Sequence, residues 1–258
     1  MDLTTARHAF VTGGASGLGL GIADALAARG LRITIADILP DLLDRVLAER
    51  ADQFRCVLLD VRDREGWSRA KAEAELAFGP VDVLVNNAGI APDGRPFADM
   101  NPESFDRVLG INLVGVANGV FAFAGAMRER GAGHIVNTAS VGGLSMPGPG
   151  LGGYAVAKYG VVALSETARE ELASYGVGVS VLCPDFVLTG LGQNTARIGG
   201  EMSMSGRTPP ATDVTSADVG EAVVDGIERD AAYILTHRDS WPPIERRMRA
   251  IEEACRRV

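Results

Sequence analysis

The sequence predicts a doubly wound α/β sandwich, a parallel sheet with helices on both faces, formed as a single domain over residues 1–258. Three observations predict it. Short, almost wholly apolar runs alternate with helix-length runs along most of the chain, and such strands belong in a sheet buried on both faces. A glycine-rich turn follows the first apolar run. A length of 258 residues does not require a second domain, and no repeat or linker interrupts the alternation.

Each strand-like run is rich in β-branched or other apolar residues and is bounded by turn-forming residues. The expected strands are His8–Thr12, Arg32–Asp37, Arg55–Asp60, Val81–Val85, His134–Ser140, Val177–Leu182 and Ala232–Thr236. The runs between them carry apolar residues at the spacing of three and four that is typical of helices. The expected helices begin at Leu18 and end before Gly30, and then cover Asp41–Arg50, Glu65–Phe78, Pro102–Arg130, Tyr154–Tyr175 and Ala217–Glu228.

The charge of the chain argues against nucleic acid as a partner. The formal net charge is −8, whereas phosphate binding needs a basic face. Arginines gather only near the C-terminus, where glutamates interrupt them, so we expect a solvated helix face there. These residues are Arg246, Arg247, Arg249, Arg256 and Arg257, with Glu245, Glu252 and Glu253 among them.

The remaining composition is typical of a cytoplasmic protein with no membrane segment. The first ten residues lack the apolar stretch of a signal peptide. The longest apolar segment, Ile111–Met127, is too short and too mixed to span a bilayer, so we expect a buried helix there. The three cysteines and three histidines show no shared spacing, so we expect no disulfide and no metal site.

The turn Gly13–Gly19 joins the first expected strand to the first helix. Gly13, Gly17 and Gly19 let the backbone pass close to a pyrophosphate, which the N–H groups and dipole of the helix N-terminus favour. The spacing G-x-x-x-G-x-G differs from the commoner G-x-G-x-x-G and lacks the lysine of a triphosphate-binding loop. A purely structural turn is the alternative. The position between a strand and a helix favours dinucleotide binding, with Ser16 and Leu18 also in contact.

Asp37 ends the second expected strand, 18 residues after Gly19. An acid at this position accepts hydrogen bonds from the ribose hydroxyls of adenosine and would repel a 2′-phosphate. Neither Ser16 in the turn nor Ile38 after the acid is basic, so neither offsets that repulsion. We therefore expect NAD rather than NADP, with Ile38 beside the cofactor, while a helix-capping role for Asp37 is the alternative.

Further motifs complete a pattern that runs along nearly the whole chain. They are Thr12-Gly13-xxx-Gly17-x-Gly19, Asp60-Val61, Asn86-Asn87-Ala88-Gly89, Asn112, Ser140, Tyr154-xxx-Lys158 and the run from Pro184 to Thr189. In this order they resemble the short-chain dehydrogenase/reductase family in its single-domain form. The resemblance implies a Rossmann-type sheet of seven strands, an NAD(P)-dependent oxidoreductase and a homo-oligomer (dimer or tetramer). The oligomer would form through Ile111–Met127 and the Tyr154–Tyr175 helix.

The resemblance also implies further cofactor contacts. It places Asp60 and Val61 near the adenine and Asn87 to Gly89 beside the ribose, and it places the run that begins at Pro184 at the nicotinamide. The cofactor contacts implied by resemblance are Asp60, Val61, Asn87, Ala88, Gly89, Tyr154, Lys158, Pro184, Val187 and Thr189.

The expected chemistry centres on Tyr154 and Lys158. Oxidation of an alcohol needs a base for the hydroxyl proton, and an ordinary tyrosine titrates near 10. Lys158 lies four residues after Tyr154, on the same helix face, where an ammonium would lower the pKa of the phenol. Ser140, at the end of a strand, can hydrogen-bond the substrate oxygen. Asn112 would hold a water that relays protons from Lys158.

Two departures from the family pattern fall on the substrate side. Ser140 and Tyr154 are 14 residues apart, one more than is usual, and the loop between them contains Leu144 and Met146 as candidate substrate contacts. Asp185 stands where relatives usually have glycine. It would help to select the substrate, or else it points to solvent. The stretch 188–216 has no clear periodicity and is expected to form a substrate flap, with partial disorder as the alternative.

The sequence therefore predicts an NAD-dependent oxidoreductase that acts on a mainly apolar secondary alcohol or ketone, a small-molecule substrate. Two alternatives keep the same fold. One is an epimerase or dehydratase that oxidises its substrate transiently, although such relatives carry a larger C-terminal part. The other is a regulator that binds NAD without turnover, for which the Tyr154 and Lys158 pair would be unnecessary.

Overall fold

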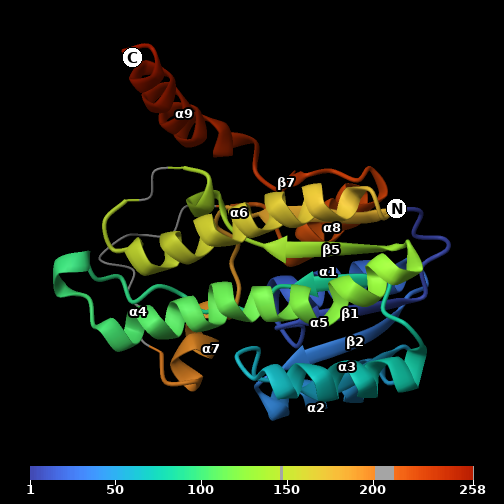
Figure 1. Ribbon diagram of the computed structural model, residues 1–258. Helices are drawn as coiled ribbons and strands as arrows, with labels where there is room; N and C mark the ends of the chain where they lie inside the picture. Colours follow the sequence, from blue (N-terminus) through green and yellow to red (C-terminus); the bar gives the residue numbers. More distant parts are fainter. Residues whose placement is uncertain (146–147, 201–211, 258) are drawn as a thin grey trace.

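Parallel strands form the centre of the molecule. The computed structural model describes residues 1–145, 148–200 and 212–257. In these ranges seven strands form one sheet in the order β3-β2-β1-β4-β5-β6-β7, and every neighbouring pair is parallel (Figure 1). They are β1 (His8–Thr12), β2 (Arg32–Asp37), β3 (Phe54–Leu58), β4 (Val83–Asn86), β5 (Gly133–Thr138), β6 (Val177–Cys183) and β7 (Tyr233–Leu235). The predicted doubly wound α/β fold is confirmed.

Helices cover both faces of the sheet. They are α1 (Gly17–Ala28), α2 (Pro40–Arg50), α3 (Arg64–Phe78), α4 (Pro102–Leu109), α5 (Gly115–Arg130), α6 (Gly152–Ala173), α7 (Leu191–Arg197), α8 (Ser216–Glu228) and α9 (Trp241–Cys255). Short 3-10 turns occur at η1 (Phe97–Asp99), η3 (Val141–Gly143) and η4 (Arg238–Ser240). The strand order reverses between β1 and β4, and ligands of such sheets bind beyond the carboxyl ends of the strands at this switch point.

Two apolar cores lie on opposite faces of the sheet, because successive strand residues point to opposite sides. Val11 of β1 belongs to the core that α1, α2 and α8 cover. Its neighbour Phe10 belongs to the core that α3, α5 and α6 cover. There the Phe10 ring lies 5.2 Å from that of Phe123 and 5.9 Å from that of Trp67, which makes Trp67 a packing residue. The two cores hold the carboxyl ends of β1 and β4 in fixed positions.

The long helix predicted over Pro102–Arg130 is continuous but not regular. A π-helical segment, η2 (Gly110–Val114), lies between α4 and α5 and contains Asn112. Among the described residues, this is the one helix long and apolar enough to cross a membrane by length and composition, and 50% of its most apolar window is buried. Burial of that extent is typical of a core helix, in agreement with the expectation for Ile111–Met127. A π-helical turn inside an α-helix often marks a functional position.

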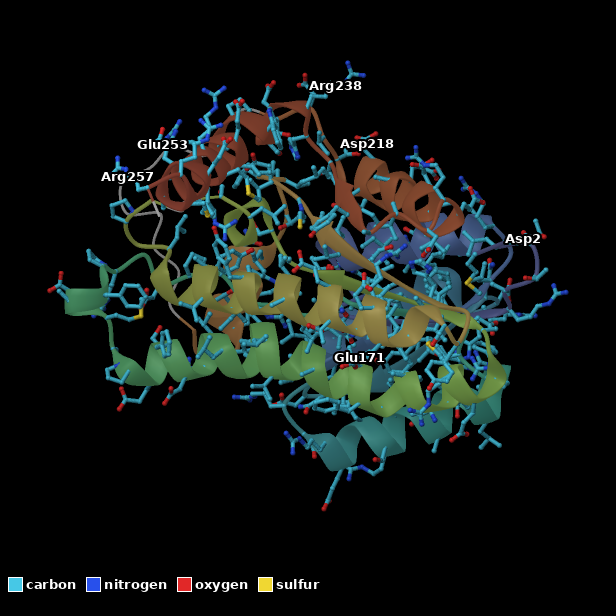
Figure 2. All side chains as sticks on the ribbon, turned by 45° about the horizontal axis from the view of Figure 1, so that its top comes forward. Asp2, Glu171, Asp218, Arg238, Glu253 and Arg257 are labelled. Carbon is cyan, nitrogen blue, oxygen red and sulfur yellow. The ribbon has the colours of Figure 1, made fainter. Side chains whose placement is uncertain are left out.

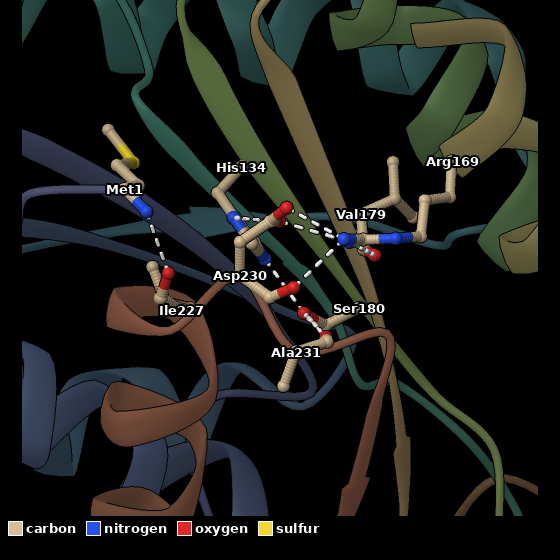
Figure 3. A network of polar contacts seen from close by, with 8 residues as sticks. All are labelled: Met1, His134, Arg169, Val179, Ser180, Ile227, Asp230 and Ala231. Carbon is tan, nitrogen blue, oxygen red and sulfur yellow. Dashed lines mark hydrogen bonds and ion pairs between the residues drawn. The ribbon is translucent and has the colours of Figure 1, made fainter. Parts of the chain in front are cut away.

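A buried polar network closes the amino end of the sheet (Figure 3). His134, at the start of β5, is fully buried and its Nε2 lies 2.8 Å from Ser180 Oγ. Its Nδ1 lies 4.0 Å from the Asp230 carboxylate, which Arg169 binds at 2.7 Å. A Cβ on Gly178 would lie only 2.4 Å from His134 Nδ1, so the absence of a side chain there makes room for the ring. These residues lie far from the glycine-rich turn and serve packing.

The last helix, α9, extends away from the sheet (Figure 1). Its arginines pair within the helix, Arg249 with Glu245 and Arg256 with Glu252, and most of its side chains are exposed. The expected solvated helix face is therefore present. Figure 2 shows charged side chains around the outside of the whole molecule, among them Asp218, Arg238 and Glu253. All three cysteines are free thiols.

Candidate active site

The glycine-rich turn has the geometry that a bound pyrophosphate requires. Gly13 and Gly17 adopt φ values of +59° and +54°, which disfavour any residue with a side chain. A Cβ on Gly13 would lie 2.8 Å from Ala88 Cα, and one on Gly19 would lie 2.2 Å from the Gly13 carbonyl oxygen. The φ values exclude a side chain at Gly13 and Gly17, and the short Cβ distances exclude one at Gly13 and Gly19. The turn is therefore a cradle that only glycines can form.

Asp37 lies at the end of β2 and faces this turn. One carboxylate oxygen accepts hydrogen bonds from the backbone N–H groups of Ile38 at 2.8 Å and Leu39 at 3.2 Å. The other accepts from Ala15 N at 3.2 Å. Burial raises the pKa of Asp37, and the three N–H donors oppose that rise. These donors lie in the loops before α1 and α2, and Leu39 at the start of α2 has no side-chain cap, so the alternative role of Asp37 as a helix cap is not found.

The segment after β4 is fixed to the same turn. Thr12 Oγ1 accepts hydrogen bonds from Asn87 N at 2.9 Å and Ala88 N at 3.1 Å. The Asn87 side chain donates to the carbonyl oxygens of Thr12 and Gly13 at 3.1 and 3.3 Å. Asp60, after β3, forms an ion pair with Arg62 at 2.6 Å, which lowers the pKa of its carboxyl group. The contacts of Thr12 and Asn87 hold the ends of β1 and β4 together, and Asp60 at the end of β3 lines the same space.

That space is a cleft along the carboxyl edge of the sheet, enclosing about 1080 Å³ when its open mouth is included. Fifteen of the predicted site residues line it. They are Gly13, Ser16, Gly17, Leu18, Asp37, Ile38, Asp60, Val61, Asn87, Ala88, Gly89, Tyr154, Lys158, Pro184 and Thr189. Residues from both halves of the chain therefore meet in one elongated site, which crosses from β2 and β3 to β5 and β6.

Tyr154 and Lys158 lie side by side on α6, as their spacing predicts. Lys158 is buried, and its Nζ donates to the Thr138 carbonyl oxygen at 2.7 Å and lies 5.6 Å from the centre of the Tyr154 ring. Burial lowers the pKa of Lys158 to about 8. Burial also raises the pKa of Tyr154, although a hydrogen bond with Ser140 opposes that rise. The predicted lowering of the pKa of Tyr154 by Lys158 is therefore not found: loss of water around both groups is the larger effect.

Ser140 lies beside this pair through the packing of η3 on α6. A Cβ on Gly143 would lie 2.6 Å from the Lys158 carbonyl oxygen, so the turn after Ser140 rests directly on the helix backbone. The Ser140 hydroxyl accepts a hydrogen bond from Gly142 N at 3.1 Å and lies 3.4 Å from the Pro184 carbonyl oxygen. The longer loop before Tyr154 thus leaves Ser140 and Tyr154 together.

Asn112 is fully buried in η2, and both the nitrogen and the oxygen of its side-chain amide form hydrogen bonds. Its Nδ2 donates to the Ile90 carbonyl oxygen at 2.9 Å, and its Oδ1 accepts from Ile90 N at 2.8 Å. The side chain therefore positions the segment that follows Gly89. Each end of the amide keeps one further N–H or lone pair, and a proton relay through Asn112 remains a prediction.

Some predicted residues lie outside the cleft. The side chain of Val187 packs into the core of α1 and α8, and Leu144 packs on the apolar cluster beneath β6. Asp185 is exposed, and its carboxylate accepts a hydrogen bond from Phe186 N at 2.8 Å. The structure thus turns Asp185 to the surface, which was the alternative for this residue. Met146 lies outside the described residues.

The structure also brings residues into the cleft that sequence reasoning missed. Within the predicted flap, α7 forms a helix, and Leu191, Asn194, Thr195 and Ile198 line the cleft. No helix is predicted within 188–216, so α7 is a feature that the sequence analysis missed. A helix of seven residues is too short for apolar periodicity to reveal it. The rest of the flap includes residues 201–211, outside the described ranges.

Comparisons with known proteins agree with this arrangement. Residues 7–197 match the family model described as short chain dehydrogenase. The chain is 32% identical to a C alpha-dehydrogenase of a Sphingobium species, over 94% of this chain and 84% of that protein. It is 36% identical to levodione reductase of Leifsonia aquatica, over 75% of this chain and 74% of that protein.

Solved structures share the fold over almost the full length. A short chain dehydrogenase/reductase from Burkholderia phymatum, in complex with NAD, superimposes with a TM-score of 0.89 and 32% identity. The match covers 98% of this chain and 97% of that chain. The range that the family model matches contains the glycine-rich turn, Ser140, Tyr154 and Lys158. The chain is therefore an oxidoreductase of the short chain dehydrogenase family.

Proposed function

We propose that the protein is an NAD-dependent dehydrogenase or carbonyl reductase in which Tyr154 is the general acid or base. One observation carries the proposal: Tyr154 and Lys158, with Ser140 beside Tyr154, lie in the same cleft as the glycine-rich turn and Asp37. When bound, the nicotinamide would supply or accept the hydride. The residues of the chain must then hold the cofactor, orient the substrate oxygen and move one proton.

The shape of the cleft supports a dinucleotide as the cofactor. Gly13 and Gly17 of the turn line the cleft, where their backbone could approach a pyrophosphate closely. Asp37, whose carboxylate is held by backbone N–H donors, is placed to accept the ribose hydroxyls of adenosine and to disfavour a 2′-phosphate. Asp60 and Val61 line the same end of the cleft, where they would contact the adenine. These features favour NAD over NADP.

The proton transfer follows from the positions of three side chains. Ser140 lies close enough to Tyr154 to lower the pKa of the phenol, so both hydroxyls would reach one substrate oxygen. In alcohol oxidation Tyr154 would take the hydroxyl proton, and in carbonyl reduction it would return one. Lys158 lies next to the ring, and its charged form would favour the phenolate. Because burial raises the pKa of Tyr154, this help from Lys158 is needed.

Apolar side chains support a mainly apolar secondary alcohol or ketone as the substrate. Gly152 and Gly153, just before Tyr154, lie so close to Phe97 and Phe105 that a Cβ would approach their rings to 2.6 and 3.2 Å. Phe97 is nonetheless 64% exposed, so one side of its ring faces outward near the substrate side. The name of levodione reductase describes reduction of levodione, which agrees with carbonyl chemistry on an apolar substrate.

A substrate screen tests the proposal. Purified protein is mixed with NAD or NADP and a panel of secondary alcohols, and formation of reduced nicotinamide is followed by absorbance. We expect turnover with NAD, and at least tenfold lower kcat/KM with NADP. Net reduction of NAD separates this function from epimerisation or dehydration, in which the cofactor is restored in each cycle. Tight NAD binding without turnover of any substrate would instead support a non-catalytic regulator.

We further propose that the chain forms a homo-oligomer in the cytoplasm. Val114 and Phe121, on the long helix, are 41% and 70% exposed, and Val156 on α6 is 44% exposed. Apolar side chains grouped on two neighbouring helices favour contact with a second copy. Light scattering of the wild type and of Phe121→Glu would test this interface: a lower mass for the variant is expected, and an unchanged mass contradicts it.

A further inference from the structure

Helix α7 crosses the cleft and is tied to three separate elements around it. Its Asn194 Nδ2 donates to Ser16 Oγ in the glycine-rich turn at 2.9 Å. Thr195 is 1% exposed, and its hydroxyl accepts from Ala91 N, in the segment after β4, at 3.0 Å. At the end of the helix Arg197 forms an ion pair with Asp41, in the first turn of α2, at 2.5 Å.

The three contacts surround the space assigned to the dinucleotide. Ser16 belongs to the turn assigned to the pyrophosphate, and Asp41 lies four residues after Asp37, the residue assigned to the ribose of adenosine. The charge of Arg197 also favours the ionised form of Asp37, so the guanidinium lies within electrostatic range of that carboxylate. Sequence reasoning found no basic residue near Asp37, because Arg197 is 160 residues away along the chain.

The way in which α7 is held indicates that it can open. Thr195 is the one buried residue of the helix, and Ile198 at its C-terminal end packs, partly buried, on the core of α3, α5 and α6. Polar side-chain contacts and this single apolar side chain hold the helix in place. The ion pair of Arg197 with Asp41 is largely exposed, and such pairs are weak. A short helix fixed by a few weak contacts can detach at low cost, and opening of such elements commonly sets the rate of ligand release.

We propose that α7 is a clasp on the dinucleotide, in which Asn194 and Arg197 are cofactor-positioning residues and the Arg197–Asp41 ion pair slows cofactor release. Within the predicted flap, α7 thus acts on the cofactor at its adenosine end, in addition to any contact with substrate. The inference rests on the proposed function, because it requires a dinucleotide in the cleft. A bound NADH would lie beneath α7, and it could leave only after these contacts break.

Stopped-flow fluorescence of NADH release tests the clasp without any substrate. The variants are Arg197→Ala, Asp41→Ala and the double variant. An exposed ion pair of ordinary strength predicts a release rate about two- to fivefold faster in each single variant. The double variant should be no faster than the faster single variant, because either change breaks the same pair.

A matched control is Arg29→Ala. Arg29 pairs with Glu221 between α1 and α8 at 2.7 Å, with side chains 36% and 57% exposed, against 40% and 62% for Arg197 and Asp41. We expect wild-type NADH release in this variant.

A further test variant, Thr195→Val, removes the buried hydroxyl at nearly constant volume. It should speed NADH release about tenfold or more, because Ala91 N–H loses its acceptor.

The outcomes separate the two proposals. If the wild type binds NADH and the Arg197 and Asp41 variants release it at the wild-type rate, the clasp is wrong and the proposed function stands. Independent, multiplicative effects of the two variants would also overturn the clasp. If the wild type gives no signal with NADH or NADPH, the proposed function fails, and the clasp fails with it.

Discussion

The two ends of the sheet both bury polar side chains, but they use them differently. At the amino end His8 Nδ1 lies 2.8 Å from the Gly79 carbonyl oxygen and His8 Nε2 lies 2.8 Å from Thr34 Oγ1. His134 contacts Ser180 in the same way. At the carboxyl end Lys158 is buried and Tyr154 is partly buried, yet both line an open cleft. One end is filled by its own side chains, and the other leaves space for a ligand.

The difference teaches how to separate a structural from a functional polar group when both are buried. Burial lowers the pKa of His134 to about 4 and that of Lys158 to about 8, so a shifted pKa alone does not distinguish them. What differs is the surroundings of each group. The ring of His134 faces Ser180 and Asp230, whereas Lys158 uses one hydrogen bond to Thr138 and otherwise faces the cleft.

The largest expected effect comes from removing one oxygen at the carboxyl end. Tyr154→Phe keeps the ring and its packing but removes the group that exchanges the proton. We expect kcat to fall by about 10²–10⁴-fold, the range of general acid–base catalysis, with NADH affinity unchanged within about threefold. Steady-state kinetics and fluorescence titration measure the two quantities. Turnover within tenfold of the wild type would remove Tyr154 from the mechanism.

A second variant, Lys158→Met, tests whether the ammonium opposes the effect of burial on Tyr154. Without it, the pKa of the phenol should rise further, because burial already raises it. Alcohol oxidation needs the phenolate, so its rate increases as pH rises through that pKa. We expect this limb of the pH–rate profile to move upward by about 1–3 pH units, with a lower rate at pH 7. An unmoved limb would mean that Lys158 acts only by holding the cofactor.

A smaller effect, on stability and not on turnover, is expected at the amino end. His134 has an ordinary pKa of 6.5 when unfolded and of about 4 when folded. Below pH 6.5 the unfolded chain therefore binds a proton that the folded chain does not, and the free energy of unfolding falls until about pH 4. The loss by pH 5 is about 2 kcal/mol. Urea unfolding of the wild type and of His134→Gln, at pH 7.5 and pH 5, measures it.

In His134→Gln this part of the pH dependence should disappear, and kcat/KM at pH 7.5 should remain near that of the wild type. The glutamine amide can still reach Ser180 Oγ, so the variant is expected to fold. His8, whose pKa burial also lowers, stays in place and leaves a residual slope in both proteins. An equal slope in the wild type and the variant would show that His134 does not titrate in this range.

The sequence was sufficient for the architecture because the fold depends on patterns that are local in the chain. Apolar runs of strand length, helices ended by glycine, and the turn Gly13–Gly19 each report on their own segment. The boundaries shifted by one or two residues, as in β3, which ends at Leu58 and not at Asp60. The relative positions of Tyr154 and Lys158 could be predicted equally well, because a spacing of four residues on one helix places both side chains on the same face.

Features that depend on distant contacts could not be predicted in this way. The pairing of Arg197 with Asp41 joins residues 156 positions apart, and nothing in either segment indicates the other. The direction of the pKa shift of Tyr154 could not be predicted from the sequence either, because it depends on how much water the folded chain removes from Tyr154 and Lys158. The use of both ends of the Asn112 amide by Ile90 depends on the π-helical turn, which no periodicity predicted.

The smallest effect is expected at Asp185, which lies at the carboxyl end of the sheet but is directed away from the cleft. Its carboxylate accepts a hydrogen bond from Phe186 N and its side chain is exposed. Asp185→Gly should therefore leave NAD affinity and the ratio of kcat/KM between two substrates unchanged within about twofold. Stability should fall by about 0.4–1 kcal/mol, because glycine gains freedom in the unfolded chain. Asp185→Asn, which keeps the hydrogen bond without the charge, is the matched control and should match the wild type in both respects. If selectivity instead changes in both variants, the charge of Asp185 acts on the substrate, and position at the carboxyl edge matters more than the direction of the side chain.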